Sequence, residues 1–305
     1  MFLRALLVAG CNNEPDVYMF SNFQKNGEDG LHLAYSEDGL KWTALNNNTS
    51  FLKPEAGKDK LMRDPCIIKG ADGQFQVVWA VSWNEKGIGY AWSEVLINWS
   101  EQQYIPVMEH EPDALNCWAP ELFWDKDSGQ YMIYWASTIP GRFPDTDGMG
   151  DQNYNHPMYY TLTSDLQDFT KDAVLYDHGF NVIDATIQKA DGEYVIFLKD
   201  ENLLPEAVKN TRIATSSTLT SGYSAASEPI TNNWVEGPTT IKIDGNWTVY
   251  FDRYTEGRMG AVISYDLENW TDITDQISFP EGTRHGTVFT IKRKMLNNLL
   301  NHNNS

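Results

Sequence analysis

The chain has 305 residues, of which 41% are hydrophobic, and this is enough to bury one large core in a single domain. Its formal net charge of −19 and its sequence pI near 4.6 argue against nucleic acid or an anionic membrane surface as a partner, because both would be repelled. The composition therefore favours a neutral or cationic ligand.

The N-terminal segment, residues 1–16, contains a short apolar run that follows the basic Arg4 and ends at Cys11. This pattern resembles a bacterial lipoprotein signal, in which the cysteine is lipidated after cleavage. It predicts a linker and a lipid anchor at Cys11 that tethers the protein to the bacterial cell envelope, as a periplasmic or surface lipoprotein; the alternative is a secreted protein. Cys66 and Cys117 show no metal-binding spacing and are expected to be buried.

A hairpin pattern recurs along the chain. An apolar strand that opens with acidic or aromatic residues leads into a turn with Asp-Gly or Ser-Gly, and a second strand follows that starts with an aromatic. The four copies cover residues 63–75, 118–131, 183–194 and 235–247. Strand repeats of about 40 to 50 residues are typical of a β-propeller. The spacing to the turn glycine predicts that Asp64, Asp184 and Glu236 occupy equivalent positions around one axis.

Five outer-strand signals accompany these hairpins, each a Ser or Thr at the end of a strand with an aromatic residue about six positions later. They predict five blades, although only four complete inner hairpins are present. The fifth blade must then combine an inner strand at residues 284–291 with a partner strand at residues 17–21. The fold class is thus an all-β, five-bladed β-propeller over residues 17–291, closed by pairing of the N- and C-terminal strands. Residues 292–305 form a C-terminal tail.

Two segments do not repeat. Residues 139–157 are rich in Gly, Pro, Asp and Asn, and residues 199–211 form a second irregular stretch. Loops of such length in a compact fold are usually functional or mobile. Both are expected to rim the mouth of the central channel, where they favour a closed pocket over an open cleft.

The inner strands of a propeller line its channel, so their first residues converge at one mouth. In this chain the convergent acids are Asp64, Asp184 and Glu236. Hydrolysis of a glycosidic bond needs an acid that protonates the leaving oxygen and a carboxylate that activates water or attacks the anomeric carbon. A third carboxylate can keep the acid protonated by like-charge repulsion. The pattern therefore predicts glycoside chemistry on a carbohydrate substrate.

The order of the inner-strand motifs is Asp-Pro, Trp-Ala-Pro, Ile-Asp, Glu-Gly-Pro and a strand with His285. This order resembles glycoside hydrolase family 43, the five-bladed propeller arabinofuranosidases, xylosidases and arabinanases, over about residues 17–291. The resemblance implies that Asp64 is the general base, that Glu236 is the general acid, and that Asp184 orients this acid and modulates its pKa. The family is inverting, which implies a water molecule between base and acid.

Further side chains are expected to bind the sugar. These are Arg63, Trp118, Glu121, Arg253, Arg284 and His285. For Arg253 and Arg284 a structural salt bridge is the alternative. No cofactor is required for this chemistry, but family members often hold Ca²⁺ beside such a histidine, commonly through water, so the resemblance implies an optional calcium ion at His285.

The sequence thus predicts an exo-acting, inverting glycoside hydrolase that removes a terminal sugar from plant-type polysaccharides or oligosaccharides. α-L-Arabinofuranose is the first choice, followed by β-D-xylose and β-D-galactose. One alternative is a propeller that binds glycans without catalysis. Another is a retaining hydrolase, because Arg63-Asp64-Pro65 is also similar to the propeller fructosidases of family 32, although their Asn-Asp-Pro and Glu-Cys motifs are missing. A propeller phosphorylase is a further alternative.

Overall fold

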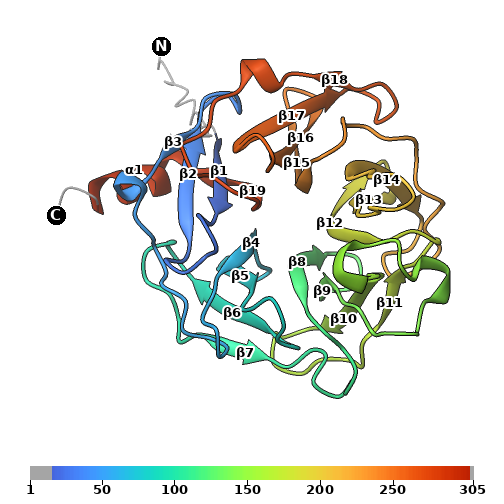
Figure 1. Cartoon of the computed structure of the whole chain (residues 1–305). Coiled ribbons are helices and arrows are strands. Elements are labelled where there is room, and N and C mark those ends of the chain that lie inside the picture. The colour runs from blue at the N-terminus through green and yellow to red at the C-terminus, as the bar shows by residue number, and fades with distance from the viewer. Residues whose placement is uncertain (1–15, 303–305) are drawn as a thin grey trace, which may run out of the picture.

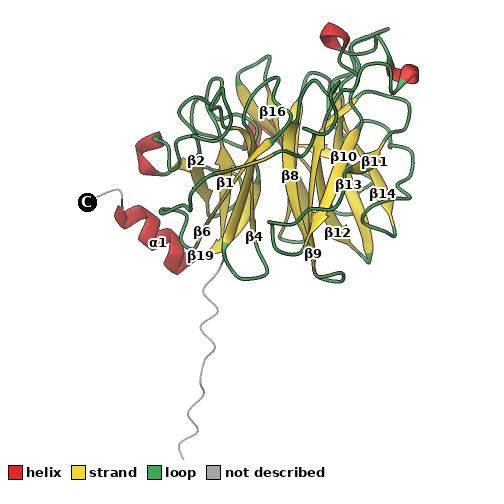
Figure 2. Cartoon of the chain, turned by 90° about the horizontal axis from the view of Figure 1, so that it is seen from below, coloured by secondary structure: helices red, strands yellow, loops and turns green. Residues whose placement is uncertain are grey.

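The computed structural model describes residues 16–302, so the predicted anchor at Cys11 lies outside the described residues. Within that range, five antiparallel sheets are arranged like the blades of a propeller around one axis (Figure 1). Figure 2 shows the ring edge-on, with the strands crossing its thickness. The all-β, five-bladed architecture predicted from the repeats is confirmed. No helix among these residues is long and apolar enough to cross a membrane.

The strands of each blade follow one another from the axis outward. Blade I consists of β19 (Val288–Lys292), β1 (Asp16–Asn22), β2 (His32–Ser36) and β3 (Thr43–Ala44). Blade II consists of β4 (Arg63–Lys69), β5 (Phe75–Ala80), β6 (Ile88–Ser93) and β7 (Gln103–Ile105). Blade III consists of β8 (Trp118–Asp125), β9 (Gln130–Ala136), β10 (Met158–Thr163) and β11 (Ala173–Tyr176).

The remaining two blades have the same order. Blade IV has three strands within the described range, β12 (Val182–Ala190), β13 (Glu193–Asp200) and β14 (Asn210–Ser216). Blade V consists of β15 (Glu236–Ile243), β16 (Asn246–Arg253), β17 (Arg258–Ser264) and β18 (Thr271–Asp272). Short 3₁₀ helices lie in the loops between strands: η1 (Asn46–Asn48), η2 (Pro144–Thr146), η3 (Asp151–Asn153) and η4 (Thr274–Gln276).

The two ends of the chain meet in blade I. The strand β19 pairs antiparallel with β1, with Val288 opposite Phe20, which agrees with the closure expected from the split hairpin. The chain continues directly into the helix α1 (Arg293–His302). Leu296 and Leu299 of this helix are buried in the core shared by blades I and II, so the predicted tail packs as part of the domain.

The core consists of hydrophobic clusters between neighbouring blades. In β5, Phe75, Val77 and Trp79 belong to the cluster shared with blade I, whereas Val78 belongs to the cluster shared with blade III. Neighbouring blades therefore cover both faces of this strand. The same packing explains why the second strand of each hairpin is a near-continuous apolar run in the sequence. Cys66 is buried and free in the second of these clusters.

The inner strands of blades II to V share a bulge close to their first residue. The ladder register shifts after the first paired residue of β4 and β15, as it does near the start of β8 and β12. A residue at the bulge has a positive φ in each case: Asp64 (53°), Ala119 (43°), Asp184 (51°) and Gly237 (59°). Bulges of this kind re-aim side chains and are frequent beside active sites. In each of these four blades, the bulge thus turns side chains at the start of the inner strand toward the axis.

This register corrects the predicted equivalence of the three acids. Glu236 is the last residue paired before the bulge, so it occupies the position of Arg63. Gly237, and not Glu236, occupies the position of Asp64 and Asp184. The spacing to the turn glycine hides this offset because the turns differ in length: five residues separate the last ladder pair of β4 and β5, whereas two separate the last pair of β15 and β16.

Candidate active site

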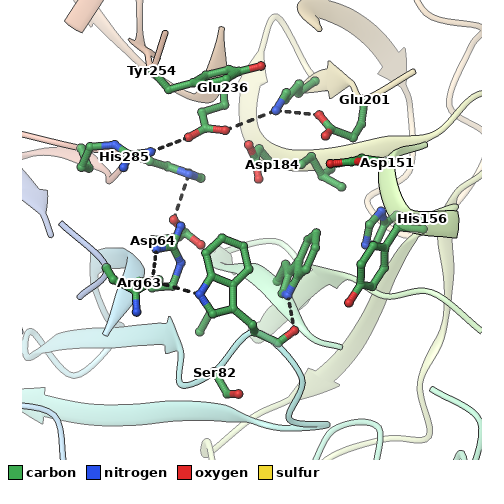
Figure 3. Close-up of a pocket in the computed structure, with 18 of the residues that line it drawn as sticks. Arg63, Asp64, Ser82, Asp151, His156, Asp184, Glu201, Glu236, Tyr254 and His285 are labelled. Carbon is green, nitrogen blue, oxygen red and sulfur yellow. Dashed lines mark hydrogen bonds and ion pairs between the residues drawn. The ribbon is translucent and has the colours of Figure 1, made fainter. Parts of the chain in front are cut away.

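A cavity of about 790 Å³ opens at the end of the axis where the inner strands begin (Figure 3). Its lining includes the three predicted acids, Asp64, Asp184 and Glu236. Of the predicted sugar contacts, four also line it: Arg63, Trp118, Arg284 and His285. The bulged ends of four inner strands and the residues before β19 therefore converge as the repeat pattern predicted.

Asp64 forms an ion pair with His285, with Oδ1 lying 3.2 Å from Nδ1, and both side chains are almost fully buried. Burial alone would raise the pKa of Asp64, but the charge of His285, supported by Arg63 and Arg284, holds it below its usual range. Burial lowers the pKa of His285, yet the charges of Asp64 and Asp184 outweigh it and raise this pKa to about 9. Asp64 is thus held as a carboxylate.

Asp184 lies deep in the cavity and contacts the strand that carries the predicted acid. Its Oδ2 accepts a hydrogen bond of 3.0 Å from the backbone N–H of Gly237. Burial raises the pKa of Asp184 to about 6. The positive charge of His285 acts to lower this pKa, and the negative charges of Glu236 and Asp64 act to raise it further. Asp184 therefore fixes the backbone beside Glu236 and places a negative charge near it.

Glu236 is held by cations on both carboxylate oxygens. Arg284 donates from Nη2 to Oε1 at 2.9 Å, and Lys199 donates from Nζ to Oε2 at 3.4 Å. Lys199 is 2% exposed and also pairs with Glu201 at 2.6 Å, and Glu201 pairs in turn with the buried Lys209. Burial lowers the pKa of Lys199, but the charges of Glu201 and Glu236 raise it well above its usual value. A buried chain of alternating charges thus positions Glu236.

Arg284 bridges two acids of blade V. Besides Glu236, it contacts Asp252, with Nε lying 2.5 Å from Oδ2. Burial, followed by the charge of Glu236, raises the pKa of Asp252 to about 6. Next to this pair, a Cβ at Gly237 would lie 2.2 Å from the Cγ of His285, so only glycine lets the ring approach this strand.

Two predicted sugar contacts do not lie at the cavity, and both predictions are corrected. Arg253 is outside the lining and its guanidinium pairs with Glu256. Glu121 is buried below the acids, where it accepts hydrogen bonds from Thr186 Oγ1 at 3.1 Å and from Thr287 Oγ1 at 3.2 Å. Glu121 belongs to the position after the bulge, which points along the closed part of the axis, so it forms part of the layer beneath the cavity.

Burial raises the pKa of Glu121 to about 7. The nearby Tyr134 hydroxyl also donates to its Oε2, at 3.4 Å. This layer of hydroxyl groups around one carboxyl occupies the axis, and so the cavity has a floor.

Aromatic side chains form the wall on the side of blades II and III. The ring of Trp118 lies 4.7 Å from that of Tyr154 and 4.9 Å from that of His156. Its indole Nε1 donates to the backbone carbonyl of Trp83 at 2.8 Å. Trp83 is 43% exposed, and the guanidinium of Arg63 stacks 4.1 Å from its ring centroid. Flat apolar surface is thus offered to a ligand opposite the acids.

Several lining residues were not singled out from the sequence. Tyr154, His156 and Asp151 come from the insertion 139–157, whose expected place at the rim is confirmed. Lys199 and Glu201 lie where the apolar run of β13 ends. Charged residues at the end of a buried strand are costly to bury without a partner, so this pattern could have identified them as candidates from the sequence.

A calcium ion would need about six to eight oxygen ligands. At His285, Nδ1 is already paired with Asp64, while Glu236 faces Arg284 and Lys199. Among residues 16–302, the one set of three acidic, His or Cys ligand atoms within 4.8 Å of one another lies elsewhere, at His110, Glu111 and Asp172. The donors around His285 therefore do not fit calcium in this arrangement, and its presence there stays a prediction of the family resemblance.

The fold and the site define a class, the five-bladed β-propeller with carboxylates converging in its central funnel. A family model described as "Probable glycosyl hydrolase domain", related to glycoside hydrolase family 43, matches residues 14–297. The chain belongs to this family.

Relatives and solved structures agree with that membership. An α-L-arabinofuranosidase of Bifidobacterium longum subsp. longum is 25% identical over 202 residues, which are 58% of this chain and 18% of that protein. The chain thus spans less than a fifth of the length of this relative. A thermostable family-43 glycoside hydrolase has a similar fold, with a TM-score of 0.56, 18% identity and coverage of 74% of this chain and 81% of the other. An α-L-arabinofuranosidase from Lactobacillus brevis has a TM-score of 0.52, with 19% identity and coverage of 69% and 72%.

Proposed function

We propose that the protein is an exo-acting, inverting glycosidase that removes a terminal sugar from plant-type polysaccharides or oligosaccharides, with α-L-arabinofuranose as the first choice. The observation that carries the proposal is the convergence of Asp64, Asp184 and Glu236 in one cavity. A pair of carboxyl groups is the minimum equipment for hydrolysis of a glycosidic bond. The third carboxyl adds a means of tuning the other two.

In the proposed mechanism, Asp64 is the general base. Its ion pair with His285 keeps it ionised, so it can accept a proton from a water molecule while that water attacks the anomeric carbon. Glu236 is the general acid and gives its proton to the glycosidic oxygen as the bond to the anomeric carbon breaks. Attack from the face opposite to the leaving group inverts the anomeric configuration.

Asp184 acts on Glu236 through position and charge. Its hydrogen bond to the N–H of Gly237 fixes the strand end that carries the acid. The negative charges of Asp184 and Asp252 oppose the attraction that Arg284 and Lys199 exert on Glu236.

Exo action is supported by the floor of the cavity. The buried Glu121 and the hydroxyl groups that donate to it occupy the axis below the acids, so a polysaccharide chain cannot pass through the channel. The insertion 139–157 contributes side chains to the rim. A pocket closed at its end accepts a terminal residue of a sugar chain. Arabinofuranose is supported by the relative that bears this activity in its name, and β-D-xylose and β-D-galactose are the next choices.

A panel of aryl glycosides and plant oligosaccharides tests the activity and identifies the sugar. The variants Asp64→Asn and Glu236→Gln are each expected to lower turnover by about 100-fold or more, because general acids and bases contribute about that much. Glu268→Gln is the matched control, since Glu268 is exposed on the turn after β17, at the opposite end of blade V from Glu236. Near wild-type turnover in either site variant would contradict the assigned roles.

A further inference from the structure

We propose that Trp234 is the platform for the sugar ring directly beyond the cleaved bond, and that this ring is a neutral pyranose of a polysaccharide chain. The inference rests on the proposed function, because it takes Glu236 as the proton donor. A general acid must lie within hydrogen-bond reach of the oxygen that it protonates. The leaving sugar therefore departs on the side of the cavity where Glu236 lies.

Trp234 stands on that side, in contact with a residue of the cavity lining. It precedes Glu236 by two residues, and its ring lies 6.4 Å from that of Tyr254 in an edge-on contact. Tyr254 lines the cavity and lies beside Glu236 in Figure 3. Trp234 itself is outside the lining. A sugar that leaves Glu236 and passes Tyr254 thus meets Trp234 next.

The backbone holds Trp234 in an unfavourable conformation. Its φ of 67° is left-handed, which is a genuine outlier for a bulky residue. The next residue, Val235, donates its N–H to the carbonyl of Lys209 at 3.0 Å, and the side chain of Asn233 donates to the carbonyl of Ala207 at 3.3 Å. Strained conformations persist where the surrounding structure enforces them, and they cluster at ligand sites.

The indole remains 42% exposed in spite of this fixed backbone. Among the tryptophans in residues 16–302, only Trp83 is comparably exposed, and it stands on the side of Asp64, where Arg63 stacks on it. A fixed, exposed aromatic ring next to a lining residue gains burial energy when a ligand covers it.

The chemistry of the surface indicates the class of sugar. An indole face is flat and apolar, and it stacks best on a ring that presents a flat face of C–H groups, as a pyranose chair with mostly equatorial hydroxyl groups does. The net charge of −19 disfavours an acidic sugar such as a uronic acid. A neutral backbone pyranose that carries the terminal sugar meets both requirements.

Two substrates with the same terminal sugar test the proposal. One is an arabinofuranosyl-substituted xylo-oligosaccharide, and the other is α-L-arabinofuranosyl fluoride, whose leaving group is too small to reach Trp234; if the panel identifies another sugar, the matching pair is used. Trp234→Ala is expected to lower kcat/KM for the oligosaccharide relative to the fluoride by about five- to tenfold, the scale of one aromatic contact. Trp234→Phe should retain most of this ratio.

Tyr265→Ala is the control, because Tyr265 is 79% exposed and follows Ser264, which pairs with Trp247 at the other end of the blade. This variant should keep the wild-type ratio. An unchanged ratio in Trp234→Ala, with the wild type active on both substrates, would overturn the role of Trp234 and leave the proposed function intact. If the wild type hydrolyses neither substrate of any pair, the proposed function and this inference both fail.

Discussion

Replacement of Glu121 by glutamine should change how the stability of the protein depends on pH. Glu121 is fully enclosed beneath the cavity, and burial raises its pKa from the ordinary value of 4.5 to about 7. The folded state therefore binds this proton more tightly than the unfolded state does. The free energy of unfolding should fall as the pH rises from about 4.5 to 7, by about 3 kcal/mol at 1.36 kcal/mol per pKa unit.

Glutamine has the same shape and is neutral at every pH, so the variant lacks this fall. Its amide can still accept from Thr186 or Thr287 and donate to the other hydroxyl. Urea denaturation of both proteins at about pH 4.5, 6 and 8 measures the difference in the free energy of unfolding, which should move in favour of Glu121→Gln by about 3 kcal/mol over that range. Parallel pH profiles for the two proteins would refute the placement of Glu121 in a dry layer, where burial outweighs the opposing charge of His285.

Three further variants probe the surroundings of the acids. Lys199→Met should lower kcat and cost about 3 kcal/mol or more of stability, because it breaks a buried charge chain on Glu236; kinetics and urea denaturation check both, and unchanged kcat would contradict a positioning role. Gly237→Ala should destabilise the fold by more than about 1 kcal/mol and reduce activity, since its Cβ would meet the ring of His285 at a positive φ; a thermal melt at the wild-type temperature would speak against this. Arg253→Ala should keep the wild-type KM, because its guanidinium is engaged outside the cavity, and a raised KM would restore its predicted contact with the sugar.

Local patterns in the sequence were sufficient to predict the ring of blades. Turn glycines separate apolar strands in each hairpin, and the unpaired strands near Tyr18 and Phe289 indicated the closure that β1 and β19 form. The convergence of Asp64 and Asp184 followed from the same repeat, because equivalent strand ends in a propeller face one axis.

Features that depend on the exact strand register could not be predicted in this way. Glu236 lies one position before the place that Asp64 and Asp184 occupy at the bulge, and Glu121 lies below the cavity instead of lining it. The contact of Lys199 with Glu236 joins strands of two blades, so no local pattern contains it. Long-range pairs of this kind arise from the packing of blades, and they decide which charged residues meet.

In the proposed inverting hydrolysis, Asp64 acts as the base and Glu236 as the acid. The most direct test is the anomeric configuration of the sugar first released from the substrate that the panel identifies, followed by ¹H NMR before mutarotation, with Asp64→Asn as the inactive comparison. The proposed roles predict that the first product has the configuration opposite to that of the substrate. A first product with the retained configuration would contradict them and would assign one of these carboxylates to nucleophilic attack.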